Sequence, residues 1–234
     1  IGRLLDGGAL GIIVPDVISA DMAREAVNLC RMPPFGDRSI GGPIPLTGYQ
    51  PLPGAQISQI VNDETMVIAQ LESGEAIDQS EAIAAVDGID ALFIGSSDLT
   101  LSLGIPGQFT HEKTQDCFRR AIELHPTYAD AHINLGLTQQ MQNHPTDAIE
   151  TLRLGINAHP EHSDLHWNLA LALLQNGDYQ EGWQEYEWRW RMPKFAIFTR
   201  QIDAPLWQGE DMAGQTLFIH AEQGLGDTLH FVRY

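Results

Sequence analysis

The chain has few basic residues and few cysteines, and both shortages exclude classes of function. Its 234 residues carry 13 Lys and Arg against 31 Asp and Glu, which gives a formal net charge of −18. A basic surface for nucleic-acid phosphates is therefore not expected, and anionic membrane surfaces are disfavoured for the same reason. Cys30 and Cys117 are far apart in the chain, which favours a reducing, cytoplasmic compartment over a disulfide framework.

Long apolar runs are also lacking. No run in the sequence approaches the roughly 20 residues that a membrane-spanning helix needs, and the start of the chain lacks the basic and apolar regions of a secretory signal. Because the chain begins with Ile1 rather than Met and stops within a helix-like pattern, we expect it to be part of a longer protein.

The first 110 residues have the alternating pattern of an α/β protein. Short apolar runs rich in β-branched residues predict strands buried on both faces, as in a parallel sheet. These runs lie at 10–17, 65–71 and 91–94. Between them we expect helices at 19–32, with Ser19 as its cap, and at 75–86, and a long Gly- and Pro-rich loop over 36–56. Strands joined through helices predict βαβ units.

Two of these strands are followed by acidic residues. Glu72 comes directly after the run 65–71, and Asp98 lies shortly after the run 91–94. The chemistry of parallel α/β folds is placed at the carboxyl ends of their strands. Two carboxylates from neighbouring strand ends would suit Mg²⁺ or Mn²⁺. The spacing alone leaves open the alternative of two solvated surface acids.

Several motifs of this half occur in an order that resembles the HpcH/HpaI family of metal-dependent, pyruvate-specific aldolases. They are Leu4-Leu5-Asp6-x-Gly8, Gly11-Ile12-Ile13-Val14-Pro15, Pro33-Pro34-x-Gly36-x-Arg38, Gln70-Leu71-Glu72-Ser73 and Phe93-Ile94-Gly95-Ser96-Ser97-Asp98-Leu99. The resemblance covers about residues 1–110. It implies a segment of a (β/α)8 barrel with about three of the eight strands.

The resemblance also implies roles for particular residues. Glu72 and Asp98 would hold the divalent metal, with Gln70 beside it. The backbone N–H groups of Gly95, Ser96 and Ser97 would bind the carboxylate of pyruvate. The metal would act as a Lewis acid on the enolate in the reversible cleavage of a 4-hydroxy-2-oxo acid into pyruvate and an aldehyde.

Two departures from the family bear on activity. Ser96 stands where the family usually has Pro, and the family's general-base His and substrate-binding Arg belong to strands that would precede Ile1. Three parallel strands cannot close a barrel. We therefore expect lyase ancestry without useful aldolase activity in this chain.

Residues 112–195 have a different pattern, with a period of 34 residues. Pro126 and Pro160, His132 and His166, and Leu135 and Leu169 are pairs at this spacing. The period resembles tetratricopeptide (TPR) repeats, with about two and a half repeats present. This implies an all-α array whose concave surface binds a peptide or protein partner. The alternative is an array that only supports a neighbouring domain.

Aromatic and imidazole side chains are frequent in this second segment. His162 and His166 have the i, i+4 spacing that can bind a metal, but with no third ligand evident we expect surface histidines. Trp183, Trp188 and Trp190 are expected to bury apolar area at the end of the array. A ligand platform is the alternative for these three rings.

Residues 205–234 form a third segment. Thr216–His220 predicts a strand, and Gly224-x-Gly226-Asp227 predicts a turn into a helix. Such a turn either cradles an anion on free N–H groups or is a plain βα connection. The segment resembles the start of the glycosyltransferase-like domain found after TPR repeats, which makes Asp227 the candidate active-site residue. With one strand of that domain present, transferase activity is not expected, and the chain is predicted to be a mosaic of 1–110, 112–195 and 205–234.

Overall fold

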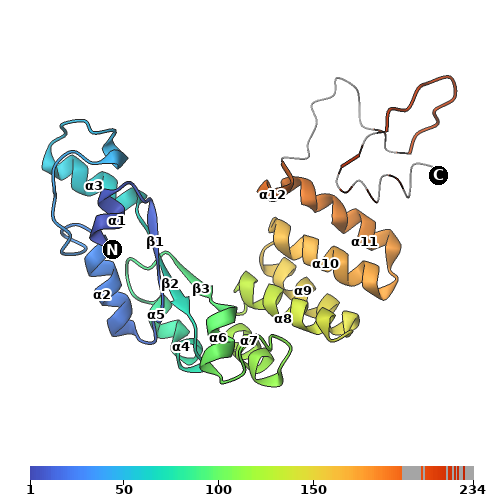
Figure 1. Ribbon diagram of the computed structural model, residues 1–234, viewed down its shortest axis with the longest axis horizontal. Helices are drawn as coiled ribbons and strands as arrows, with labels where there is room; N and C mark the ends of the chain where they lie inside the picture. Colours follow the sequence, from blue (N-terminus) through green and yellow to red (C-terminus); the bar gives the residue numbers. More distant parts are fainter. Residues whose placement is uncertain are drawn as a thin grey trace.

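The computed structural model describes residues 1–196 and, beyond them, residues 207, 209–219, 221, 222, 224, 226 and 229. A small sheet with its covering helices lies at one end of the molecule, and a stack of helices extends from it (Figure 1). Within the described part of the chain, no helix combines the length and the apolar character that crossing a membrane requires.

The sheet contains three parallel strands in the order β1-β2-β3. They are β1 (Gly11–Val14), β2 (Met66–Leu71) and β3 (Ala91–Ile94). Val14 lies beside Ala69, and Leu71 lies beside Ile94, so the carboxyl ends of the strands meet at one edge. The three predicted strands are confirmed. The first is shorter than its apolar run, because Pro15 has no N–H to donate to a ladder.

The connections between strands are helical, as predicted. Helix α1 (Gly2–Asp6) precedes the sheet, α2 (Ala20–Cys30), the 3₁₀ turn η1 (Pro45–Thr47) and α3 (Gly54–Glu64) join β1 to β2, and α4 (Gly74–Asp78) and α5 (Ser80–Ala84) join β2 to β3. The Ser19 hydroxyl accepts a hydrogen bond from Met22 N–H and caps α2 as expected. The predicted loop 36–56 ends early, because α3 begins at Gly54.

The predicted single helix over 75–86 was wrong. The chain forms two short helices that meet at Gln79, whose ψ is 2°. Ile77 and Ile83 are both fully buried, yet six residues place two side chains about 120° apart around one straight helix. The break brings both side chains onto the same core.

The sheet is buried on one face, whereas the sequence predicted burial on both. Val67, Ala69 and Leu71 are fully buried on the helix-covered face. Side chains alternate between faces along a strand, and the opposite face leaves Ile13 and Phe93 52% and 41% exposed. The apolar runs showed that both faces of the strands are hydrophobic. Whether the second face is covered depends on which other segments pack against it, and a local sequence pattern does not indicate that.

A series of helices follows the sheet. The series contains α6 (Ser96–Ser102), α7 (Glu112–Leu124), α8 (Ala129–Met141), α9 (Pro145–Ala158), α10 (Ser163–Asn176), α11 (Tyr179–Tyr186), the 3₁₀ turn η2 (Glu187–Arg191) and α12 (Pro193–Ala196). The helices from α7 onward pack as a stack (Figure 1). Small residues let neighbouring helices approach closely. A Cβ at Gly136 would lie 2.8 Å from Leu152 Cγ, and one at Gly155 would lie 2.8 Å from Leu165 Cδ2.

One hydrophobic core joins the sheet to the first helices of the stack. Phe118 of α7 and Leu135 of α8 belong to the same buried cluster as Leu71 and Ile94 of the sheet. Helix α8 packs beside β3, and α7 packs on α4. The hydrophobic core is therefore continuous across the domain boundary that the sequence predicted near residue 111.

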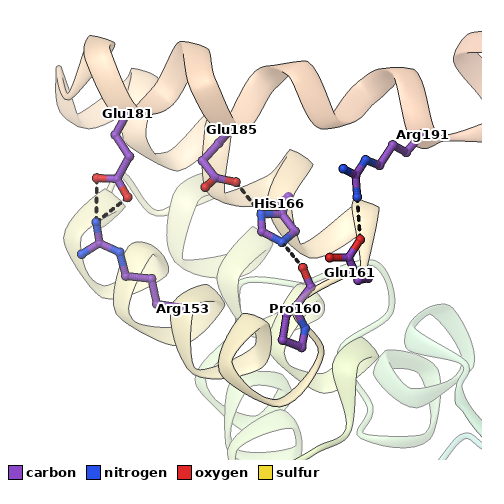
Figure 2. Close-up of polar contacts among 7 residues, drawn as sticks. All are labelled: Arg153, Pro160, Glu161, His166, Glu181, Glu185 and Arg191. Carbon is purple, nitrogen blue, oxygen red and sulfur yellow. Dashed lines mark hydrogen bonds and ion pairs between the residues drawn. The ribbon is translucent and has the colours of Figure 1, made fainter.

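Polar contacts tie α9 and α10 to α11 and η2 (Figure 2). Arg153 pairs with Glu181 at 2.8 Å, and Arg191 pairs with Glu161 at 2.6 Å. His166 Nδ1 contacts the Glu185 carboxylate, and its Nε2 lies 2.8 Å from the Pro160 carbonyl oxygen. These contacts fix the last helical pair on the one before it.

The expectation of surface histidines at 162 and 166 was wrong for His166, and His132, at the same place 34 residues earlier, is buried in the same way. His166 and His132 are 6% and 2% exposed, and both ring nitrogens of each lie against oxygen atoms. The pair His162 and His166 therefore leaves no free His166 nitrogen for a metal. Sequence spacing placed these rings on one helix face, but only the packing of the next helix decided their burial.

The three tryptophans differ in burial. Trp188 stacks on His166 with ring centroids 3.7 Å apart, but Trp183 and Trp190 are 57% and 37% exposed. The expectation that all three bury apolar area was wrong for Trp183, more than half of which is exposed, whereas Trp190 buries most of its surface. Helix α11 approaches α10 through Gly182, where a Cβ would lie 2.8 Å from Leu174 Cδ2, so the adjacent Trp183 does not share that contact face.

The third predicted segment is described only in part. Residues 215–219 are irregular, so the predicted strand Thr216–His220 is absent from the positions that can be compared. A local apolar run does not form a strand without a neighbouring strand to pair with. Asp227, the transferase-like candidate, lies outside the described residues.

Candidate active site at the strand ends

The carboxylate of Glu72 is buried at the carboxyl end of β2. Its side chain is 6% exposed, and Oε2 accepts a hydrogen bond of 3.0 Å from the backbone N–H of Asp16. Asp16 follows β1 with a φ of 54°, a left-handed conformation that Asp tolerates better than most residues. Val17 N–H donates to Gln70 C=O at 3.3 Å, which holds this turn against β2.

The charges of two other carboxylates act on Glu72. Burial raises the pKa of Glu72, and the charges of Asp16 and Asp98 raise it further, while the hydrogen bond from Asp16 N–H opposes the increase. Asp98 lies exposed in the first turn of α6. The structure thus brings Glu72 and Asp98 within electrostatic reach of each other, as the strand-end argument expected.

The backbone of Gly95 passes close to the side chains of Glu72 and Gln70 at the strand ends. A Cβ at Gly95 would lie 2.6 Å from Gln70 Nε2 and 2.8 Å from Glu72 Oε1. Real Cβ contacts are almost never this short, so only glycine lets the backbone pass so close to both side chains. This close approach places the predicted supporting residue Gln70 beside the predicted ligand Glu72.

The three backbone donors expected at residues 95–97 are reduced to two. Gly95 N–H donates to Leu71 C=O at 3.0 Å and is therefore not free to bind a substrate carboxylate. Ser96 and Ser97 lie in the first turn of α6, where N–H groups have no acceptor within the helix. The role predicted for Gly95 is therefore corrected: its lack of a side chain leaves room for Gln70 and Glu72, and its N–H is not a substrate donor.

A cavity of about 380 Å³ opens beside this point. Its walls are formed by Gln70, Phe93, Ile94, Gly95, Ser96, Ser97 and Asp98 from the sheet side and by Asp130, Ile133 and Asn134 from α8. Glu72 is not part of the wall and lies behind Gly95. The predicted residues Gln70, Ser96, Ser97 and Asp98 therefore share one cavity.

The donor set fits a hard divalent cation held by two carboxylates. Glu72 is buried, faces the charges of two other carboxylates, and has no Lys, Arg or His partner in the described part of the chain. A cation would relieve that repulsion, and carboxylate oxygens are the ligands that Mg²⁺ and Mn²⁺ prefer. Within the described ranges no group of three or more His, Cys, Asp or Glu could hold a metal, so other ligands would come from substrate and solvent.

Sequence reasoning missed three residues of this region. Asp16 follows the first strand directly, so the strand-end argument that found Glu72 could have found it as well. Asp130 and Asn134 lie on α8, and no signal in the sequence placed that helix beside β3. Burial raises the pKa of Asp130, with Asp164 adding to the rise and His162 opposing it.

The cysteines contribute no nucleophile to the region. Burial raises the pKa of both the Cys30 and the Cys117 thiol. A thiol needs a lowered pKa to be an effective nucleophile near neutral pH. The chemistry of the site therefore depends on oxygen ligands and amide donors.

Parallel strands with carboxylates at their carboxyl ends define the class of α/β enzymes that work at one rim of a sheet. The HpcH/HpaI aldolase/citrate lyase family matches residues 1–135, which is more than half of the chain, and the chain belongs to this family. The matched range runs through α7 into α8, beyond the boundary expected from the sequence.

Individual proteins are similar to part of the chain. A 4-hydroxy-4-methyl-2-oxoglutarate aldolase of Hapsidospora irregularis is 40% identical over 53% of this chain and 44% of its own length. A 2-keto-3-deoxy-L-rhamnonate aldolase of Escherichia coli is 36% identical over 52% of this chain and 45% of its own. The crystal structure of an HpcH/HpaI aldolase from Desulfitobacterium hafniense is 40% identical over 54% of this chain and 48% of its own, with a TM-score of 0.49. The chain spans less than half the length of these relatives.

Proposed function

We propose that the strand-end site binds a divalent cation and a pyruvate-type 2-oxo acid, as part of an aldolase that cleaves 4-hydroxy-2-oxo acids into pyruvate and an aldehyde. The observation that carries this proposal is the buried Glu72 carboxylate, held beside Asp16 and Asp98 with no cationic partner among the described residues. The family assignment and the names of the aldolase relatives support it.

Each residue of the site has a proposed task. Glu72 and Asp98 would hold Mg²⁺ or Mn²⁺, which when bound supplies Lewis-acid stabilisation of the enolate. The N–H groups of Ser96 and Ser97 would bind the substrate carboxylate. Gln70, fixed beside Gly95, would donate a hydrogen bond from its amide within the same cavity.

The site is proposed to bind its ligands better than it turns them over. General acid–base catalysis contributes typically about 10²–10⁴-fold, and no histidine lines the cavity among the described residues. The chain also has no Lys or Arg on the described cavity wall to orient a keto acid, and orientation is a large share of catalysis.

Calorimetric titration of the whole chain with Mn²⁺, followed by pyruvate, tests the proposal. Glu72→Ala and Asp98→Ala should each abolish most of the Mn²⁺ heat. Glu64→Gln is the matched control, because Glu64 precedes the amino end of β2 and Glu72 follows its carboxyl end. Equal heats in all four proteins would overturn the metal site.

We propose a second role for residues 112–195 as a TPR-type array. The supporting observation is a repeated contact: Nε2 of His132 and Nε2 of His166 lie 2.9 and 2.8 Å from the carbonyl oxygens of Pro126 and Pro160, each six residues earlier. Such an array would bind a peptide or protein partner on its concave surface, as an alternative to merely supporting the site. The glycosyltransferase-like assignment of 205–234 stays a prediction from sequence, and so does the mosaic origin of the chain.

A pull-down with immobilised full-length chain would test the partner role. Trp167→Ala, which alters the first helix of the second hairpin, should reduce the amount of any specifically retained protein. Retention that does not depend on this substitution would leave the array with a supporting role only.

A further inference from the structure

The cavity beside the strand ends has one wall that the aldolase-type strands do not provide. Asp130, Ile133 and Asn134 of α8 face the residues 95–98 across this space. The wall is fixed in place, because α8 packs beside β3 and Tyr128, at the amino end of α8, packs against the core shared with the sheet. Ala131 and Leu135, on the same helix, are buried in the core shared with the sheet. If one end of a ligand binds at the strand ends, its other end therefore contacts α8.

The charge on this cavity has one sign. Asp98 and Asp130 are its charged wall residues, and neither Lys, Arg nor His lines it within the described part of the chain. A ligand carboxylate near α8 would face carboxylate charge with no Lys, Arg or His on the described cavity wall, and like charges in such a space are strongly unfavourable. His162, whose charge acts on Asp130, does not line the cavity. Asp98 would be neutralised by the proposed cation, but Asp130 lies on the opposite wall.

The other groups of the α8 wall suit a hydroxylated ligand. The Asp130 carboxylate accepts hydrogen bonds, and the Asn134 amide both donates and accepts them. The side chains of Ile133 and Phe93 give the cavity apolar surface for C–H groups. A short carbon chain that bears hydroxyl groups would satisfy both kinds of surface.

We propose that the α8 wall, through Asp130 and Asn134, selects 2-oxo acids whose distal end is neutral and hydroxylated over those that end in a second carboxylate. This inference rests on the proposed function, since the Ser96 and Ser97 end of the cavity is taken to bind the 2-oxo acid group. It assigns substrate selection to a helix that lies outside the βαβ units.

Three five-carbon probes separate the possibilities: 4-hydroxy-2-oxopentanoate with a hydroxyl, 2-oxoglutarate with a second carboxylate, and 2-oxopentanoate with an apolar end. Their dissociation constants would be measured on the full chain by calorimetry with Mn²⁺ present, beside pyruvate as the common fragment. Wild type should bind the hydroxylated probe at least about tenfold more tightly than 2-oxoglutarate. It should also prefer that probe to 2-oxopentanoate.

Asp130→Asn is the decisive variant, because it removes the charge with little change in shape. It should tighten 2-oxoglutarate binding by about tenfold, while the dissociation constant for pyruvate stays the same. Asp147→Asn is the control: Asp147 is an exposed acid in the first turn of α9, it does not line the cavity, and its charge is not one of those that act on Asp130. That control should leave all the ratios as in wild type.

The outcomes distinguish this inference from the function it rests on. Two results would overturn the role of α8 alone, provided that wild type binds pyruvate. One is equal affinity of wild type for the three probes. The other is a set of ratios between their dissociation constants that Asp130→Asn does not change. Loss of the preference in Asp147→Asn to the same extent as in Asp130→Asn would also overturn that role, because a general charge effect would then suffice. Failure of pyruvate itself to bind would overturn both.

Discussion

The carboxylate of Glu72, at the end of β2, accepts a 3.0 Å hydrogen bond from the backbone N–H of Asp16, after the end of β1. This contact joins two strand ends that are 56 residues apart in the chain. Because Asp16 donates this bond from its backbone, the contact keeps the buried Glu72 carboxylate beside the Asp16 carboxylate. The site is therefore held in a state of electrostatic repulsion that a bound cation would relieve.

Glu72→Gln should stabilise the cation-free protein at neutral pH. The pKa of Glu72 is raised above its ordinary value of 4.5, so folding favours the protonated form and the charged form costs stability as pH rises through the raised pKa. Gln is neutral and can still accept the hydrogen bond from Asp16. At pH 7.5 the urea unfolding midpoint of Glu72→Gln should be higher than that of wild type. At pH 4.0 the two midpoints should converge. A less stable variant at pH 7.5 would contradict this account.

Gly95→Ala should disrupt the site. The added methyl group would lie 2.6 Å from Gln70 Nε2 and 2.8 Å from Glu72 Oε1, so one of these side chains must move. We expect weaker Mn²⁺ binding and a loss of about 1–3 kcal/mol in the free energy of unfolding. Gly74→Ala is the control, since nothing lies within 4 Å of its added Cβ. Unchanged Mn²⁺ heats in Gly95→Ala would refute the close approach.

Gly136→Leu should separate α8 from α9. A single Cβ at this position would already lie 2.8 Å from Leu152 Cγ, and overpacking of this kind costs about 1–3 kcal/mol or more. The denaturant midpoint should fall accordingly. Leu137→Ala, at a neighbouring residue that is 37% exposed, should change the free energy of unfolding by no more than about 0.5 kcal/mol. Equal effects of the two substitutions would count against close helix packing.

His166→Ala should loosen the last helical pair. The ring loses its contacts with Glu185 and the Pro160 carbonyl and its stacking on Trp188, and we expect a loss of about 2 kcal/mol. Tryptophan fluorescence would report the changed surroundings of Trp188, alongside thermal unfolding. The exposed His144 provides the control His144→Ala, which should match wild type in both measurements.

Turnover of 4-hydroxy-2-oxo acids by this chain should be low even with Mn²⁺ or Mg²⁺ supplied. A positioned base is worth about 10²–10⁴-fold, and the described cavity wall contains no histidine. Release of pyruvate from 4-hydroxy-2-oxopentanoate, followed by a coupled assay, gives the measurement. Rapid metal-dependent release that Glu72→Ala abolishes would show that another group in the protein completes the site.

The amino-acid sequence by itself determined the positions of the three strands, the placement of Glu72 and Asp98 after two of them, and the helical character of the second half. These features follow from apolar periodicity, capping residues and turn residues, which act between neighbours in the chain. The family resemblance could also be recognised from the sequence, because its motifs are short and local.

Only the tertiary structure decided which face of the sheet is covered, that His132 and His166 are buried, and that Asp130 and Asn134 of α8 face the strand ends. It also turned Gly95 from an expected donor into the residue that makes room for Glu72 and Gln70. Each of these depends on segments far apart in the chain packing together. A local pattern records that a side chain is apolar or charged, but it does not record what will lie against that side chain.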